Sequence, residues 1–156
     1  MSQKAFQDYY TEDFSHCYGC GRLNKHGLQI KSYWDGDESI AKFLPNAHHI
    51  AMPGFVYGGL IASLIDCHCV GTAAAAAYKA QGRGMDTEPA LRFVTASLKV
   101  NYLAPTPIGT ELEIRGKVVE IKGKKIVVDA KIIADNKTCV TGNVVVVQRP
   151  NSMKIK

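Results

Sequence analysis

The spacing of hydrophobic residues changes near residue 90 and predicts two kinds of secondary structure. Segment 58–80 is almost entirely apolar or small, rich in Ala and Leu and too long for a strand, so we expect one long helix there. Residues 93–104 instead alternate between apolar and polar side chains, which is typical of a half-buried strand. Thr95 is predicted on its polar face, opposite an apolar face made of Val94, Ala96, Leu98, Val100 and Tyr102.

Strand-like runs recur on both sides of the apolar segment. Further strands are predicted at 28–34, 39–44, 111–121, 124–134 and 138–148. Short turns at Lys122-Gly123 and Asp135-Asn136 join the last three strands, which makes them antiparallel neighbours. The chain therefore has an α+β pattern, with one helix to cover the sheet. Because this helix is apolar on all sides, we expect the sheet to curl around it and a second subunit to cover the remainder.

Length and composition indicate a single domain. The chain has 156 residues, of which 46% are hydrophobic and 21% charged, enough for one domain over 1–156 and too few for two. Residues 1–26 show no clear period and are interpreted as an N-terminal extension that contains a Cys17-x-x-Cys20 turn. Residues 149–156 are interpreted as a frayed basic tail.

Charge and cysteine content limit the expected partners and compartment. The net charge of +5 suits an acidic small molecule, but scattered Lys and Arg residues do not form the footprint of a nucleic-acid-binding protein. Five cysteines, an odd number, and a start unlike a signal peptide favour reduced thiols in the cytoplasm. The apolar segment is long enough to span a membrane, but Asp66 and His68 near its centre favour a buried helix and no membrane partner.

Asp66 stands in the most hydrophobic stretch of the chain. A buried carboxylate without partners is costly, so it usually acquires a partner or a shifted pKa. One interpretation is structural: Asp66 bonds the backbone, pairs with a cation or lies at an interface. The other is functional: Asp66 is a general base or nucleophile held in an apolar cleft.

Gly58 and Gly59 open the predicted helix and supply the second half of a possible site. Free N–H groups and the helix dipole at this end can stabilise an oxyanion. Gly58 and Asp66 are eight residues apart, which separates them by roughly 12 Å along the helix. One reacting carbonyl cannot contact both, so we expect Gly58 of one subunit to meet Asp66 of another.

Three stretches carry a family resemblance that covers nearly the whole chain. PGFVYGGLIASLIDCHC (53–69) resembles the helix-entry motif of hotdog-fold acyl-CoA thioesterases of the phenylacetic-acid-pathway type. The strand and Pro-rich end at 94–119 and the CYGCGRLNKHGLQI segment (17–30) are similar to other parts of these proteins. The resemblance implies a hotdog fold, in which a curved antiparallel sheet of about six strands wraps around one central helix. It also implies a homo-oligomer, a dimer or dimer of dimers, that hydrolyses an acyl-CoA substrate; no cofactor is expected.

The same resemblance assigns roles to particular residues. It places the catalytic carboxylate at Asp66, the oxyanion N–H at Gly58 or Gly59, and a supporting hydroxyl at Thr95. Candidate substrate contacts are Tyr57, His49 and Ser63. Two positions depart from the family pattern, since Tyr57 replaces the usual His before Gly-Gly and Ala51 replaces an Asn found in some members. A phenol still donates one hydrogen bond but does not titrate near neutral pH.

Cysteines and a histidine near Asp66 raise the question of a metal. Cys17 and Cys20 form half of a zinc motif, but Cys67 and Cys69 lie two residues apart on the predicted helix and so point about 200° from each other. We therefore expect no metal site and a packed, thiol-bearing turn. His68, also two residues from Asp66, is expected to be a hydrogen-bonded core or interface histidine.

Two other functions compete with thioester hydrolysis. A non-catalytic acyl-CoA-binding hotdog protein would explain the changes at Tyr57 and Ala51. A hotdog hydratase or dehydratase would need an acid–base pair facing one acyl chain, which the spacing of Asp66 and His68 does not supply within a helix.

Overall fold

The computed structural model describes residues 3–150 and 152–154, so the predicted tail at 149–156 lies partly outside the described residues. One α-helix, α1 (Gly58–Ala80), follows two short 3₁₀ helices, η1 (Phe6–Tyr9) and η2 (Glu12–Phe14). The strands are β1 (Ser32–Asp35), β2 (Glu38–Phe43), β3 (Phe93–Tyr102), β4 (Leu112–Lys122), β5 (Lys125–Ala134) and β6 (Lys137–Gln148).

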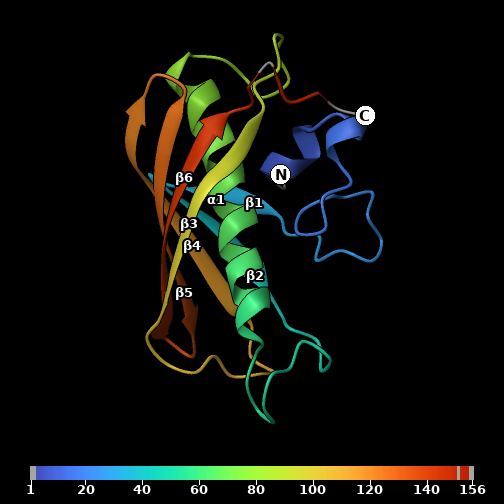
Figure 1. Ribbon diagram of the computed structural model, residues 1–156, viewed down its shortest axis with the longest axis vertical. Coiled ribbons are helices and arrows are strands. Elements are labelled where there is room, and N and C mark those ends of the chain that lie inside the picture. Colours follow the sequence, from blue (N-terminus) through green and yellow to red (C-terminus); the bar gives the residue numbers. More distant parts are fainter. Residues whose placement is uncertain (1–2, 151, 155–156) are drawn as a thin grey trace.

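All six strands form one antiparallel sheet with the order β1-β2-β4-β5-β6-β3. The sheet packs along α1 (Figure 1), and this arrangement confirms the predicted α+β class and hotdog fold. Strand β3 is ten residues long and, within the part of the chain that the structure describes, pairs with β6 alone, so it forms an edge of the sheet. The first predicted strand starts late, at Ser32 rather than Leu28. The backbone N–H groups of Leu28 and Ile30 instead donate to Tyr18 and Gly19 of the Cys17–Cys20 turn.

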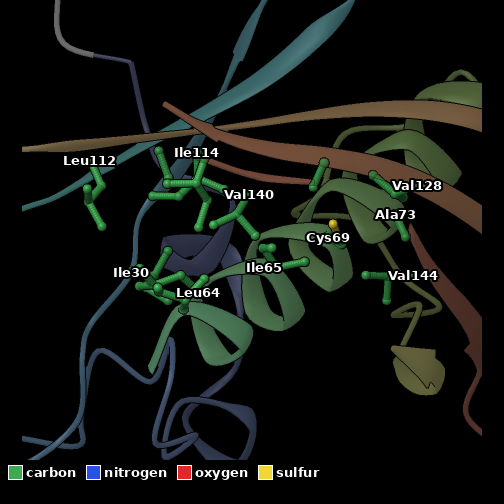
Figure 2. Packing of buried hydrophobic residues seen from close by; sticks show 14 of the residues in the cluster. Ile30, Leu64, Ile65, Cys69, Ala73, Leu112, Ile114, Val128, Val140 and Val144 are labelled. Carbon is green, nitrogen blue, oxygen red and sulfur yellow. The ribbon is translucent and has the colours of Figure 1, made fainter. Parts of the chain in front are cut away.

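The core lies between the sheet and α1. Inward-facing side chains of β4, β5 and β6, such as Ile114, Val128 and Val144, are fully buried. They meet Ile65 and Ala73 of the helix (Figure 2). Buried residues alternate with less buried ones along most of β5 and β6, the pattern expected of a sheet with one covered face.

The two halves of α1 are covered differently. Residues 71–78 are all buried, because the N-terminal extension packs on the side of the helix away from the sheet (Figure 1). Phe6 and Gln7 of η1 are the buried residues of that cover. In the first half, the less buried residues follow helical spacing in a stripe that we call the open stripe: Gly59, Ala62, Ser63, Asp66, Cys67 and Val70. The sheet alone does not bury the helix, as predicted, but the covering role of residues 5–14 was not anticipated.

His68 points away from the open stripe into a buried polar cluster. Its Nδ1 lies 2.9 Å from Ser32 Oγ and its Nε2 lies 2.9 Å from Ser39 Oγ. Gln7 Nε2 donates to Ser32 Oγ, and Thr72 Oγ1 lies 2.6 Å from Ser39 Oγ. Burial lowers the pKa of His68 to about 4, so the ring is neutral. The prediction of a core histidine is confirmed.

Helix α1 is also long and apolar enough to cross a bilayer. However, 72% of its most apolar window is buried inside the fold, as in the core helix of a globular domain.

Candidate active site

Asp66 and Thr95 form the centre of the candidate site. Asp66 lies on the open stripe of α1 and is half-buried, and Thr95 Oγ1 of β3 donates a 2.5 Å hydrogen bond to its Oδ1. Within residues 3–150 and 152–154, no cationic side chain approaches Asp66 within salt-bridge distance. The carboxylate is thus oriented by a hydroxyl and is not neutralised by a structural ion pair.

A β-bulge explains how Thr95 reaches the helix. Thr95 pairs with Val146 and Ser97 with Val145, so Ala96 is an extra residue on β3. Directly paired residues share a face, and Val146 is buried on the helix side. Thr95 therefore faces α1 together with Leu98, which pairs with the buried Val144. The prediction that Thr95 and Leu98 lie on opposite faces is wrong, because strict alternation does not account for a bulge.

A cavity of about 270 Å³ opens beside this pair. Its walls come from three parts of the chain: the N-terminal extension, the open stripe of α1, and the start of β3. They include Tyr10, Phe14, Val70, Ala74 and Phe93 together with Asp66 and Thr95. The walls are mainly apolar, so the cavity places a carboxylate in the kind of partly desolvated surroundings in which general bases and nucleophiles occur.

The helix start forms a second, separate hollow. Ile61 N donates to Tyr57 O at 3.2 Å, the first bond of the helix, so the amides of Gly58 and Gly59 precede the helical ladder. Tyr102 Oη donates to Gly58 O at 2.7 Å. Gly58 and Tyr102 line a cavity of about 370 Å³ on the side of the β3 end.

The ring of Tyr57 lies against Gly59. A Cβ added to Gly59 would lie 2.7 Å from the Tyr57 ring, so only glycine allows this approach. The Tyr57 side chain is 58% exposed. The phenol at this position thus covers part of the helix start while its hydroxyl remains available to a ligand.

The remaining candidates have different surroundings. His49 lies in the loop before α1, where its backbone O accepts from Tyr57 N and its Nδ1 accepts from Asn46 N. Burial and the nearby His48 lower the pKa of His49. Ser63 Oγ donates to Gly59 O at 2.9 Å, so its hydroxyl is bound within the helix. Among the hydrogen bonds of the described residues, Asp66 is bonded through its side chain to Thr95 and to neither His49 nor Ser63.

Three thiols gather beside Asp66. The Sγ atoms of Cys17, Cys20 and Cys67 lie within 4.8 Å of one another, and all three residues line the Asp66 cavity. Cys69 is instead buried in the core. The sequence argument considered Cys67 and Cys69 together and did not identify a cluster that takes only Cys67 from the helix. Cys67 and Cys69 point about 200° apart on the helix, and this angle could have indicated that Cys67 alone meets Cys17 and Cys20.

One long central helix and a six-stranded antiparallel sheet form the hotdog arrangement. The family model of the thioesterase superfamily matches residues 53–141. The chain belongs to this superfamily, as the helix-entry motif predicted.

Curated relatives share part of the chain. The acyl-coenzyme A thioesterase THEM4 of Xenopus laevis is 33% identical over 93 residues, 60% of this chain and 36% of that protein. THEM4 of Rattus norvegicus is 32% identical over 115 residues, 72% of this chain and 44% of that protein. The aligned regions thus span about two fifths of the length of these relatives.

Solved structures show the same architecture. A thioesterase superfamily protein from Shewanella loihica PV-4 is 45% identical and has a TM-score of 0.69, with 90% of this chain and 100% of that chain covered. The PaaI protein of the E. coli phenylacetic acid degradation operon has a TM-score of 0.64 at 17% identity, over 79% of this chain and 81% of its own. The second likeness concerns the fold alone.

Proposed function

We propose that this protein hydrolyses acyl-CoA thioesters and that Asp66 is its catalytic carboxylate. The observation that carries the proposal is the Asp66–Thr95 hydrogen bond at the wall of a mainly apolar cavity, with no salt bridge to Asp66 among the described residues. The curated relatives, which are named acyl-coenzyme A thioesterases, support the reaction class.

The chemistry requires one proton acceptor and one oxyanion site. As a general base, Asp66 removes a proton from water, and the hydroxide attacks the thioester carbonyl carbon. The tetrahedral intermediate then expels CoA as a thiolate, which takes up the proton. Alternatively, Asp66 attacks the carbonyl directly, and water hydrolyses the resulting anhydride. In both routes the Thr95 hydroxyl fixes the orientation of the carboxylate.

The oxyanion site is proposed to come from a second subunit. The amides of Gly58 and Gly59 are directed along the helix axis at its positive end, where a developing oxyanion is stabilised. They lie roughly 12 Å along the axis from Asp66 of the same helix, too far to serve one carbonyl. Two antiparallel copies of α1 side by side would bring each helix start next to the Asp66 of the other copy.

The edge strand supports such a dimer. Strand β3 has one free edge of ten residues, and its middle residues 95–99 are exposed. A long uncovered edge strand is prone to pair with another strand. Antiparallel pairing of two β3 strands would continue the sheet across the dimer. It would also bring the open stripes of the two helices toward each other.

Thiol release from a panel of acyl-CoAs tests the reaction and the carboxylate. Asp66→Asn and Asp66→Ala are expected to lower kcat by about 10²–10⁴-fold, the range for removal of a general base. Lys131→Ala, an exposed change on the central strand β5 and outside the Asp66 cavity, is the control and should keep wild-type turnover. Wild-type turnover in both Asp66 variants would exclude Asp66 as the catalytic group.

Mixing two inactive variants tests the shared site. Asp66→Asn removes the carboxylate. Gly58→Val keeps the backbone N–H but adds a branched side chain at the helix start, which hinders a ligand from reaching that N–H. A heterodimer of the two variants has one intact Gly58 facing one intact Asp66. We expect turnover to return when the two variants are unfolded and refolded together. Sedimentation velocity should show a dimer or a dimer of dimers; an active monomer would contradict the shared site.

A non-catalytic acyl-CoA-binding protein is the second candidate. It is favoured by Tyr57, which stands at the position where the family usually has His. The ring of Tyr57 lies against Gly59. Measurable acyl-CoA binding with no turnover at any chain length would support it over hydrolysis. For either function we propose a reducing, cytoplasmic location, which agrees with the five free cysteines.

A further inference from the structure

The thiols of Cys17, Cys20 and Cys67 converge although 50 residues separate the first from the last. Cys17 Sγ lies 3.7 Å from Cys67 Sγ, and the three sulfur atoms lie within 4.8 Å of one another. Tetrahedral zinc with Zn–S bonds of about 2.3 Å places its sulfur ligands about 3.8 Å apart. The Cys17–Cys67 distance already has this value, and the widest pair needs to close by only about 1 Å.

The turn that carries Cys17 and Cys20 is fixed by backbone hydrogen bonds. Gly21 N donates to Cys17 O at 2.8 Å, and Ile30 N donates to Gly19 O at 3.1 Å. A Cβ added to Gly19 would lie 2.2 Å from Cys67 Sγ, so the absence of a side chain there makes room for the third thiol. The turn therefore has a shape that brings the helix thiol to the other two.

Zinc binds the thiolate form of cysteine. A cation placed among the three sulfur atoms stabilises the negative charge on each of them, so all three can ionise together.

We propose that Cys17, Cys20 and Cys67 bind one Zn²⁺ through three thiolates, with the fourth coordination position directed to the cavity shared with Asp66. Binding displaces the remaining thiol protons into solvent. The ion joins the N-terminal extension to α1 one residue from Asp66. The site goes beyond the proposed hydrolysis and does not depend on it.

The other nearby metal-binding groups do not take part. His68 has both ring nitrogens engaged by Ser32 and Ser39, and Cys69 lies in the core between α1 and the sheet. The proposed site therefore has three protein ligands: two from the C-x-x-C turn, which has the spacing of a zinc half-site, and one thiol from the helix.

Metal binding by the fully reduced protein tests the proposal. We expect one equivalent of Zn²⁺ per chain by elemental analysis after dialysis. Titration with Co²⁺ should give the charge-transfer and d–d bands of thiolate coordination. Cys17→Ala, Cys20→Ala and Cys67→Ala should each weaken Zn²⁺ binding by more than about 100-fold, the upper end of the effect of changing an outer-shell partner.

Cys69→Ala is the matched control, since it removes a thiol from the same helix two residues away. It should bind Zn²⁺ as the wild type does, and circular dichroism should show that each variant is folded. Alkylation followed by mass spectrometry gives a second measurement: Zn²⁺ should protect Cys17, Cys20 and Cys67 from iodoacetamide and leave the rate at Cys139 unchanged.

Several results would overturn the site. Less than stoichiometric Zn²⁺ in the reduced wild type, or wild-type affinity in Cys67→Ala, would do so. A disulfide between Cys17 and either Cys20 or Cys67 in protein purified under reducing conditions would assign the cluster to redox chemistry instead. Asp66→Asn separates the two proposals, because it should abolish hydrolysis while it retains one Zn²⁺.

Discussion

The two halves of α1 are both largely apolar but have different surroundings. Residues 71–78, mostly alanine, are buried on every side by the sheet and by the N-terminal extension. Residues 58–70 are as apolar, but they present the open stripe with Asp66 at its centre. An apolar sequence thus forms a closed structural element in one half and a candidate functional surface in the other.

This difference shows that the covering elements, rather than the hydrophobicity of the helix, decide where a site forms. Phe6 and Gln7 of the extension cover the second half of the helix. The Cys17–Cys20 turn of the extension packs against the first half at Cys67. The half of α1 that Phe6 and Gln7 do not cover includes the helix start and Asp66. The exposed edge of β3 lies beside it. In the proposed dimer, the second subunit and the substrate cover these surfaces.

The largest expected effect contrasts one tyrosine of each half. Tyr78 is buried, and its Oη accepts a 2.8 Å hydrogen bond from Leu91 N. Tyr78→Ala should lower the free energy of unfolding by about 3–5 kcal/mol, the range for removal of a buried aromatic side chain. Tyr57→Ala, at the exposed helix start, should lower it by less than about 1 kcal/mol. Urea unfolding of both variants measures the contrast; equal losses would contradict the division into a closed and an open half.

The sequence predicted the bounds of the helix and strands more accurately than it predicted which segments cover the helix. Helix α1 and strands β4, β5 and β6 lie within one or two residues of the predicted ranges, because helical and alternating patterns are long there. Residues 1–26 have no period, so nothing in the sequence indicated that their short 3₁₀ helices would pack on α1.

The site was predicted in part for the same reason. Asp66 was identified because an acid in an apolar helix is costly, and the family resemblance pointed to Thr95. Their contact depends on the bulge at Ala96, which no local pattern announces. The thiol cluster depends on the path of the N-terminal extension, a tertiary property that residue spacing does not encode.

The next largest effect concerns the contact that orients Asp66 in the open half. Thr95→Val keeps the shape of the side chain but removes the donor to Asp66 Oδ1. A hydrogen bond to a charged group contributes about 1.5–3 kcal/mol, so kcat should fall by roughly 10- to 100-fold with little change in KM. Steady-state kinetics with an acyl-CoA substrate measures this. Lys131→Ala serves as the control, and a change confined to KM would assign Thr95 to substrate binding instead.

Two alanines test the packing of the halves directly. Ala73 is fully buried, whereas Ala62 belongs to the open stripe. Ala73→Leu should destabilise the protein by about 1–3 kcal/mol through overpacking. Ala62→Leu should leave the stability of the isolated subunit nearly unchanged but weaken self-association and turnover, because its side chain projects toward the proposed partner. Thermal unfolding and sedimentation at several concentrations separate the two outcomes; a large loss of subunit stability in Ala62→Leu would show that the stripe is covered by its own chain.

The smallest effect tests what the phenol contributes at the helix start. Tyr57→Phe keeps the ring against Gly59 and removes only the hydroxyl, a neutral donor worth about 0.5–1.5 kcal/mol. If that hydroxyl bonds the thioester carbonyl, kcat/KM should fall about two- to tenfold while the free energy of unfolding stays constant. An unchanged kcat/KM would mean that the ring acts only by covering Gly59. Of the groups proposed here, the backbone amides of the helix start would then be the sole oxyanion donors. The change from the family histidine to Tyr57 would have removed a side-chain hydrogen bond to the substrate, and the phenol would not replace it.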